Sequence, residues 1–200
     1  MKILVTLVVA VTCVVANAQI ITIGPFTGAH QEGYETQPRF QFQPQYVVFG
    51  GQGTVDQVGN GQGLHITTGW TFFHQVFPHS GETFMGGAGV NYEYVFNVPA
   101  LRFGGYFATN ADAPDATVTF FDENGNQIGG PLAASAPLGQ WQWNGWETTG
   151  PGIKRVRIIA NNQFAGFIMN DDMEYDPIPE PATVLVFGAG LAALAARRRK

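Results

Sequence analysis

Residues 153–160 read Ile-Lys-Arg-Val-Arg-Ile-Ile-Ala, and in an extended chain Val156 and Ile158 share one face while Arg155 and Arg157 share the other. This is the pattern of a strand with one face on a core and one face in water. Residues 120–128 add a second signal, a strand, an Asn-Gly turn and a returning strand. Across residues 19–176 such short runs alternate with Gly, Pro, Asn and Asp, without a sustained helical period. We therefore expect one all-β domain, a sandwich or a barrel.

The N-terminal segment has the layout of a secretory signal. Met1-Lys2 is a short basic start, and Ile3–Val15 is apolar apart from two threonines. Ala16-Asn17-Ala18 then supplies the small residues that a signal peptidase reads, which predicts a signal peptide over residues 1–18 and cleavage before Gln19. The apolar run is too short for a transmembrane helix, which needs roughly 20 residues. Cys13, the only cysteine, lies within it, so the mature chain would have no disulfide.

The C-terminal segment reads as a stop-transfer anchor. Ala182–Ala196 contains no charge, and a basic cluster of Arg197, Arg198, Arg199 and Lys200 follows. A helix over that stretch would be about 22 Å long, against about 30 Å of bilayer hydrocarbon. The positive-inside rule places the basic end in the cytoplasm. We expect three parts: the signal peptide at residues 1–18, the β-domain at 19–176, and a membrane-anchoring segment at 177–200.

Pro179, Glu180 and Pro181 stand directly before this apolar stretch. The order of Pro-Glu-Pro, short apolar helix and terminal arginines resembles the PEP-CTERM sorting signal. The resemblance implies an exosortase-like partner, in bacteria that make extracellular polysaccharide. It further implies a protein that is exported, anchored in the inner membrane during sorting, and then placed at the cell surface or outside the cell. An ordinary tail anchor with a chance Pro-Glu-Pro is the alternative.

The middle of the chain resembles the jelly-roll-like β-sandwich of many PEP-CTERM proteins, which is itself similar to carbohydrate-binding modules. The matching pieces are residues 102–107, 116–127 and 166–173, the last of which contains the pair Asp171-Asp172. The resemblance implies a single jelly-roll-like β-sandwich, flanked by the signal peptide and the C-terminal transmembrane helix.

Related sandwiches often hold an ion near their termini, which makes a structural calcium the cofactor to consider. Its ligands would be Glu32 and Glu35 of the N-terminal loop together with Asp171 or Asp172, because calcium prefers oxygen ligands on loops. Alternatively, these acids are solvated or cap turns. A second candidate is the loop with Asn110, Asp112 and Asp115. The spacing of Asp122, Asn124 and Asn126 imitates an EF-hand, but the required glycine and closing glutamate are missing, which favours a hairpin turn.

Catalytic motifs are not apparent, and we predict no catalytic residues. Ser80 lacks the leading glycine of a nucleophile elbow. The four histidines, His30, His65, His74 and His79, do not have metal-site spacing. A glycosidase would need two facing carboxylates, and with fifteen acids in the chain no pattern selects a pair.

Trp141 and Trp143 alternate with glutamines, so both indoles lie on one face of a strand. On an exposed face they could stack on sugar rings. In a sandwich, tryptophans are more often part of the core, since each buries roughly 200 Å². We favour the core, with the intervening glutamines in water.

Charge narrows the possible partners. Five of the ten basic residues are terminal, whereas all fifteen acids lie between Glu32 and Glu180. Such an acidic domain without a basic stripe repels phosphate backbones, which argues against nucleic acid. Three hypotheses remain: a non-catalytic surface or matrix protein, a carbohydrate-binding module for an extracellular polysaccharide, and a secreted glycoside hydrolase.

Overall fold

The computed structural model describes residues 19–71, 74–111, 115–162 and 166–179. Within these ranges the chain forms thirteen strands and one short 3₁₀ helix, η1 (Phe49–Gly51). The strands are β1 (Ile20–Thr22), β2 (His30–Glu32), β3 (Phe42–Gln43), β4 (Gln45–Val48), β5 (Gly53–Val58), β6 (Gly63–Thr67), β7 (Phe84–Ala88), β8 (Asn91–Thr109), β9 (Asp115–Phe121), β10 (Leu132–Ser135), β11 (Gln142–Thr148), β12 (Ile153–Ala160) and β13 (Ile168–Pro177). The predicted all-β fold is confirmed.

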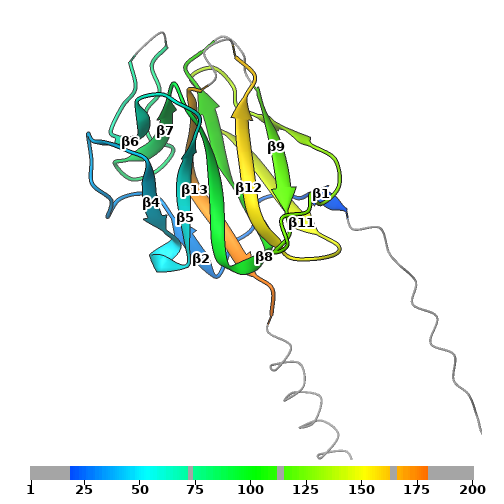
Figure 1. Cartoon of the computed structure of the whole chain (residues 1–200). Helices are drawn as coiled ribbons and strands as arrows, with labels where there is room; N and C mark the ends of the chain where they lie inside the picture. Colours follow the sequence, from blue (N-terminus) through cyan, green and yellow to red (C-terminus); the bar gives the residue numbers. More distant parts are fainter. Residues whose placement is uncertain (1–18, 72–73, 112–114, 163–165, 180–200) are drawn as a thin grey trace, which may run out of the picture.

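The long strand β8 belongs to both layers of the sandwich (Figure 1). Its first part, from Asn91 to Phe96, pairs with β5 and β12, whereas its second part, up to Thr109, pairs with β11 and β13. Pro99 lies between the two parts. Proline has no N–H for a ladder, so it fits the point where the strand changes partners. One continuous hydrogen-bond ladder therefore runs through both layers.

The first layer has the order β4-β5-β8-β12-β9-β10. The second has the order β1-β11-β8-β13-β7-β6-β3, and β2 joins the free edge of β13 beyond the end of β7. Neighbours in both layers are antiparallel. Residues 153–160 form β12 as the alternation predicts: Val156 and Ile158 are buried, and Arg155 and Arg157 lie on the outer face, near Glu93.

The core between the layers is rich in aromatic side chains. Trp146 of β11 is almost fully buried and contacts the rings of Phe103, Phe107 and Phe120. Three polar side chains interrupt this core: Asn170 Oδ1 accepts a hydrogen bond from the hydroxyl of Tyr94 at 2.7 Å and another from Tyr34. Burying a polar atom without partners is costly, and the two tyrosines compensate for the burial of the Asn170 side-chain oxygen.

The predicted turn of residues 120–128 is confirmed. Gly125 has a positive φ of 82°, and the amide of Ile128 donates to the carbonyl of Phe120 at 2.9 Å. Asp122 fixes the turn, because its Oδ1 accepts the amides of Asn124 and Asn126 at 2.9 and 2.8 Å. The EF-hand-like spacing thus serves a hairpin.

The β-domain extends slightly beyond its expected end at residue 176. Pro177 is the last residue of β13 and pairs with Ala100, and the amide of Ile178 donates to the carbonyl of Pro99 at 2.9 Å. The fold therefore includes the first residues of the expected anchoring segment, 177–200. The expected signal peptide, residues 1–18, and the expected span, Ala182–Ala196, lie outside the described residues. In the part of the chain described, no helix has the length and apolarity that a membrane crossing requires.

Candidate functional site

The candidate site lies on the outer face of the second layer, where β11, β8 and β13 run side by side. Trp143 of β11 pairs with Tyr106 of β8, and their ring centroids are 5.4 Å apart. The indole lies over Gly104 and Gly145, where an added Cβ would come within 2.8 and 2.7 Å of indole atoms. Two glycines therefore make the space in which Trp143 lies flat against the sheet.

A strap of residues 23–29 crosses this face from β1 at one edge to β2 at the other. The Phe26 ring meets Trp143 edge-on at 5.7 Å and lies under the guanidinium of Arg102 at 4.7 Å. Two carboxylates of β13 hold the strap: Glu174 accepts the amide of Gly28 at 2.8 Å, and Asp176 accepts the next amide. Gly28 is required for the close approach, since a Cβ would lie 2.8 Å from the backbone of Tyr175.

A bulge in β13 sets the direction of the neighbouring acids. The strand pairs with β7 up to Asn170 and with β2 from Met173, and its register with β8 shifts between Asp171 and Glu174. Asp172 has a φ of 45°, a left-handed conformation that Asp tolerates better than most residues. Such bulges redirect side chains at sheet edges, and here Asp171 and Asp172 both turn toward the loop between Phe77 and Thr83.

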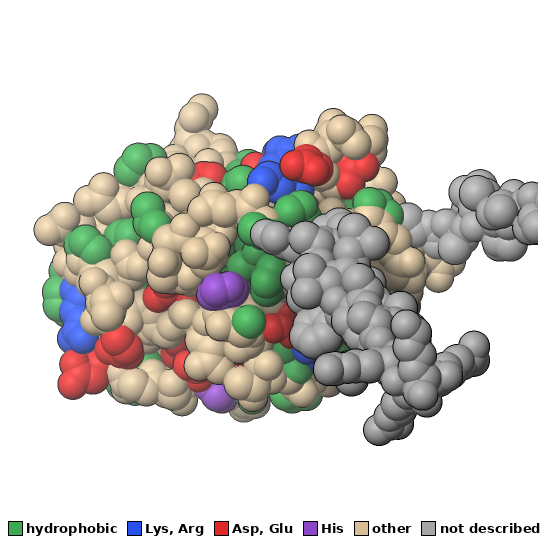
Figure 2. Space-filling model, turned by 90° about the horizontal axis from the view of Figure 1, so that it is seen from below, with side chains coloured by type: hydrophobic (Ala, Val, Ile, Leu, Met, Phe, Trp, Pro, Cys, Tyr) green, Lys and Arg blue, Asp and Glu red, His purple; other side chains and the backbone are tan. Residues whose placement is uncertain are grey.

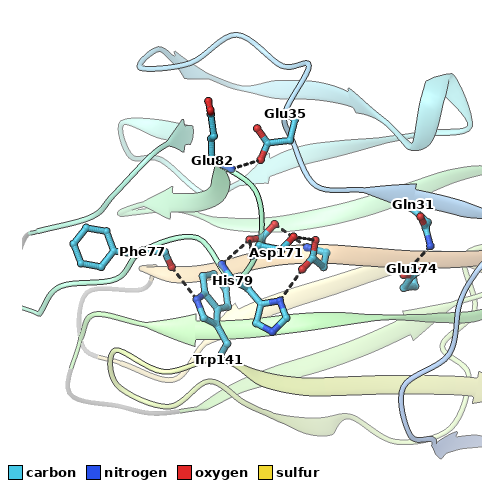
Figure 3. A network of polar contacts seen from close by, with 10 residues as sticks. Gln31, Glu35, Phe77, His79, Glu82, Trp141, Asp171 and Glu174 are labelled. Carbon is cyan, nitrogen blue, oxygen red and sulfur yellow. Dashed lines mark hydrogen bonds and ion pairs between the residues drawn. The ribbon is translucent and has the colours of Figure 1, made fainter.

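Asp171 and Asp172 dock that loop onto the sheet. Asp171 Oδ2 accepts the amides of His79 and Ser80 at 2.8 and 3.3 Å. Asp172 contacts the side chains, with His79 Nδ1 at 2.6 Å from Oδ2 and Ser80 Oγ donating to Oδ1 at 2.7 Å. Figure 3 shows His79 and Asp171 at the centre of this network, with Glu35 on the other side of the loop.

Glu35 holds the far end of the same loop. Its Oε1 accepts the amides of Glu82 and Thr83 at 2.7 and 2.9 Å. Arg39 pairs with both Glu35 and Glu82 at 3.3 and 2.9 Å. Burial by itself would raise the pKa of Glu35, but the hydrogen bonds from the loop and the nearby Arg39 together outweigh it and lower the pKa. Carboxylates from two distant segments thus fix one loop.

Asp171 is the most perturbed of these acids. Its side chain is fully buried, and this burial, with Asp172 beside it, raises the pKa of Asp171 to about 7 despite three backbone hydrogen bonds. Burial likewise raises the pKa of Glu32 and Glu174. Glu32, Asp171 and Glu174 are therefore held in an environment that disfavours their charge.

A pocket of about 320 Å³ opens between the strap and the bulge. That volume lies at the lower end of the range for ligand sites, roughly 300–1,000 Å³. Its walls combine aromatic and acidic residues, among them Phe26, Tyr106, Trp143, Glu32, Asp172 and Glu174.

The four acids predicted as calcium ligands do not converge on one point. Glu32 accepts the amides of Tyr34 and Phe49 at 2.8 and 2.9 Å, whereas Glu35 and the two aspartates bind the loop as described. Among the described residues, no three acidic, histidine or cysteine side chains are grouped to hold a metal ion. The four residues therefore do not fit a shared ion in this arrangement.

Of the second calcium candidate, Asn110 is buried and Asp115 begins β9, while Asp112 lies outside the described residues.

Trp141 and Trp143, which were expected either in the core or on a sugar-binding face, lie in two different environments. Both are half-buried on the outer face, and Trp141 packs against a small second core cluster of Val76, Phe84, Ala108 and Met169. Trp141 is covered by the loop, since its Nε1 donates to the carbonyl of Phe77 at 2.8 Å (Figure 3). Its ring also meets that of Phe84, with 5.6 Å between the ring centroids. Trp143 instead lines the pocket, with its Nε1 donating to the carbonyl of Ile23 at 3.2 Å. The fully buried core tryptophan is Trp146.

The sequence did not single out Tyr106, Phe26 or Glu174 for this site. Glu174 and Asp176 lie on the same face of β13. The alternation of residues 173–176 could have indicated that these two acids share a face. Phe26 carries no such signal, since only the path of the strap brings it to Trp143.

The molecular surface offers no continuous basic patch on the face shown in Figure 2, where acidic side chains are dispersed among hydrophobic and uncharged ones. The described basic side chains Arg39, Arg102, Arg155 and Arg157 each pair with a nearby carboxylate.

Comparison with known proteins identifies the C-terminal segment. Residues 177–200 match the family model of the PEP-CTERM protein-sorting motif. The chain carries a PEP-CTERM sorting motif. The motif indicates export with membrane-associated sorting, and it implies processing by an exosortase. No curated protein matches the chain.

Solved structures resemble the β-domain in fold. The K2 adhesin domain of Lys-gingipain has a TM-score of 0.50 at 14% identity, covering 72% of this chain and 97% of that one. The CBM22-1 xylan-binding domain of Paenibacillus barcinonensis Xyn10C has a TM-score of 0.47 at 12% identity, covering 78% and 100%. TmCBM61, solved with β-1,4-galactotriose, has a TM-score of 0.45 at 14% identity, covering 74% and 95%. At such identities the likeness concerns the fold alone.

Proposed function

We propose that this chain is an exported, non-catalytic protein of the cell surface or extracellular matrix, delivered by an exosortase that acts on its C-terminal motif. The observation that carries the proposal is the match of residues 177–200 to the sorting motif. The hydrogen bond from Ile178 to Pro99 supports it, because the folded domain then ends immediately before the Pro-Glu-Pro residues. Sorting would place the sandwich outside the membrane, with the motif directly beneath it.

The non-catalytic part of the proposal rests on how the acids are used. Asp171 has the raised pKa of a general acid, but it lies beneath the loop of residues 77–83 and binds its amides. Ser80 and His79 are adjacent in sequence, and both contact Asp172 rather than each other. A structural role accounts for each of these groups.

The experiment compares wild type with a triple variant, Pro179→Ala, Glu180→Ala and Pro181→Ala, in a host that has an exosortase. We expect the wild type to reach the surface or medium in processed form and the variant to stay in the inner-membrane fraction. Glu123→Ala, in the exposed turn of residues 122–126, is the control and should behave as wild type. Equal delivery of the triple variant would contradict the proposal.

Carbohydrate binding is the second candidate, and the pocket over Trp143 favours it. An indole lying flat against the sheet, with carboxylate and amide groups beside it, is a combination suited to sugar rings and their hydroxyls. A ligand in this pocket could retain the sorted protein in a polysaccharide matrix. Retention would then depend on Trp143, whereas delivery would not.

A further inference from the structure

Glu32, Asp172 and Glu174 all contribute to the lining of the pocket over Trp143, and no Lys or Arg does. The guanidinium of Arg102 lies over the ring of Phe26, but it pairs with Asp176. Within the described ranges, the ion pairs of Lys and Arg involve neither Glu32 nor Glu174. Glu32 is only 8% exposed, so a charge is buried in the wall with hydrogen bonds from two backbone amides as its compensation. A cation in the pocket would offset this charge.

The spacing of these acids suits an organic cation better than a metal ion. They are not grouped closely enough for three to share a metal. Instead they surround a space of about 320 Å³ that also has the rings of Phe26 and Trp143 in its walls. Aromatic faces together with carboxylates are the usual recognition elements for ammonium groups.

The carboxylates of Asp172 and Glu174 can accept further hydrogen bonds. The oxygens of Asp172 contact His79 and Ser80, and those of Glu174 contact Gly28 and Gln31. A carboxylate has about four lone-pair sites, so each can accept from a ligand without releasing the loop or the strap. Burial raises the pKa of Glu174 and Glu32, and a bound cation would lower both.

We propose that this pocket binds an amine-bearing sugar, with the ring against Trp143 and Phe26 and the ammonium group between Asp172 and Glu174. The inference rests on the proposed function for the sugar part, since an exported surface protein meets polysaccharide. It makes the pocket selective for a glycan whose amino groups are free rather than acetylated.

The test measures binding of two probes to the full-length protein by titration calorimetry at about pH 6, where sugar amines are protonated. The probes are the tetramer of glucosamine and the tetramer of N-acetylglucosamine. The protein is held in a polyoxyethylene detergent, because a maltoside detergent would itself present sugars. We expect the amine form to bind at least about tenfold more tightly, as charge-assisted hydrogen bonds predict.

Two variants separate the pocket from the general acidity of the domain. Glu174→Gln should weaken binding of the glucosamine tetramer about tenfold or more. Glu123→Gln removes the same charge from the exposed turn of residues 122–126 and should leave binding unchanged. Equal weakening by both variants would mean nonspecific attraction of a polycation and would overturn the proposal.

Three further outcomes of the binding experiment would contradict the proposal. Equal affinity for both tetramers would overturn amine selectivity and leave carbohydrate binding standing. Binding of neither would overturn the site, while export and sorting are judged separately by fractionation. A lysine tetramer that binds as tightly as the glucosamine tetramer would show that the pocket recognises ammonium groups without recognising sugar, which contradicts the proposal.

Discussion

The imidazole of His79 stacks on the phenol ring of Tyr106, with ring centroids 3.6 Å apart and planes 18° from parallel. Its Nδ1 also lies 2.6 Å from Oδ2 of Asp172. One loop residue thereby connects β8 and β13 across the outer face of the sheet. The loop it belongs to covers Trp141 and forms the border of the site next to the pocket.

Replacing His79 should loosen this loop without unfolding the domain. In His79→Ala the ring contact and the contact with Asp172 are lost, so we expect faster amide exchange at residues 79–83. The free energy of unfolding should fall by about 1 kcal/mol or less, because the side chain is partly exposed. Hydrogen exchange measured by NMR reports both effects. His74→Ala, an exposed histidine of the same segment, is the control. Unchanged exchange at residues 79–83 would show that the ring contact does not hold the loop.

Asp171 should make stability depend on pH. Its pKa is about 7 in the fold and near 3.8 in an unfolded chain, so the folded state holds the extra proton between these values. The contribution of Asp171 to the free energy of unfolding is therefore largest below about pH 4. It falls by on the order of 2–4 kcal/mol as the pH rises toward 7. Glu32 and Glu174 act in the same direction, whereas the lowered pKa of Glu35 acts oppositely in acid.

Urea unfolding of wild type and Asp171→Asn at about pH 5 and pH 8 tests this expectation. Between pH 5 and pH 8 the free energy of unfolding should fall clearly less in Asp171→Asn than in wild type, whatever the absolute stability of the variant. In Glu123→Gln it should fall as much as in wild type. An equal fall in Asp171→Asn and wild type would mean that the buried aspartate is not the titrating group.

Gly104 should tolerate no side chain. A Cβ there would lie 2.8 Å from the carbonyl oxygen of Asn144 and 2.8 Å from the indole of Trp143. Gly104→Ala should therefore cost about 1–3 kcal/mol and change the tryptophan fluorescence. Gly130→Ala is the matched control, because nothing lies within 4 Å of its added Cβ. Equal stability of the two variants would place Trp143 elsewhere than against the sheet.

Calcium removal should leave the fold intact. The carboxylates of Glu32, Glu35, Asp171 and Asp172 already accept backbone or side-chain hydrogen bonds and do not converge on one ion. We expect the same melting temperature with a chelator as with millimolar calcium. A fall in chelator that calcium restores and magnesium does not would establish a calcium site and contradict this expectation.

Local sequence patterns predicted a strand and a turn of the first layer well, but they did not predict how the chain continues between strands. The alternation in residues 153–160 and the Asn-Gly turn at residues 124–125 depend on neighbouring residues alone, and both were found. Proline usually interrupts a strand, but β8 runs through Pro99, because Ala100 pairs with Ile153 and Pro177 at the bend. Glycine-rich stretches are typical of turns, yet β7 includes Gly86 and Gly87.

The glycines of β7 show why composition alone does not distinguish a strand from a turn here. A Cβ on Gly86 would lie 2.9 Å from the ring of Trp70, and one on Gly87 would lie 2.2 Å from the carbonyl oxygen of Val90. Glycine is used here for close packing within a strand, which sequence alone does not distinguish from a turn. Similarly, Asp171 and Asp172 were candidate calcium ligands or turn-capping acids, and the bulge in β13 explains why both contact a loop.

The site was predictable in part. Trp143, Glu32 and Asp172 were selected from the sequence for two unrelated reasons, sugar stacking and calcium, and the fold places all three around one pocket. Their convergence depends on long-range pairing of β2, β11 and β13, which residue spacing does not encode.

Intact-mass analysis of the protein isolated from its own host, followed by sequencing of both termini, tests the central claim of exosortase sorting most directly. We predict a chain that begins at Gln19 and has been cut within residues 177–200, in an envelope or extracellular fraction. A chain with both termini uncut, found in the cytoplasm, would contradict the account.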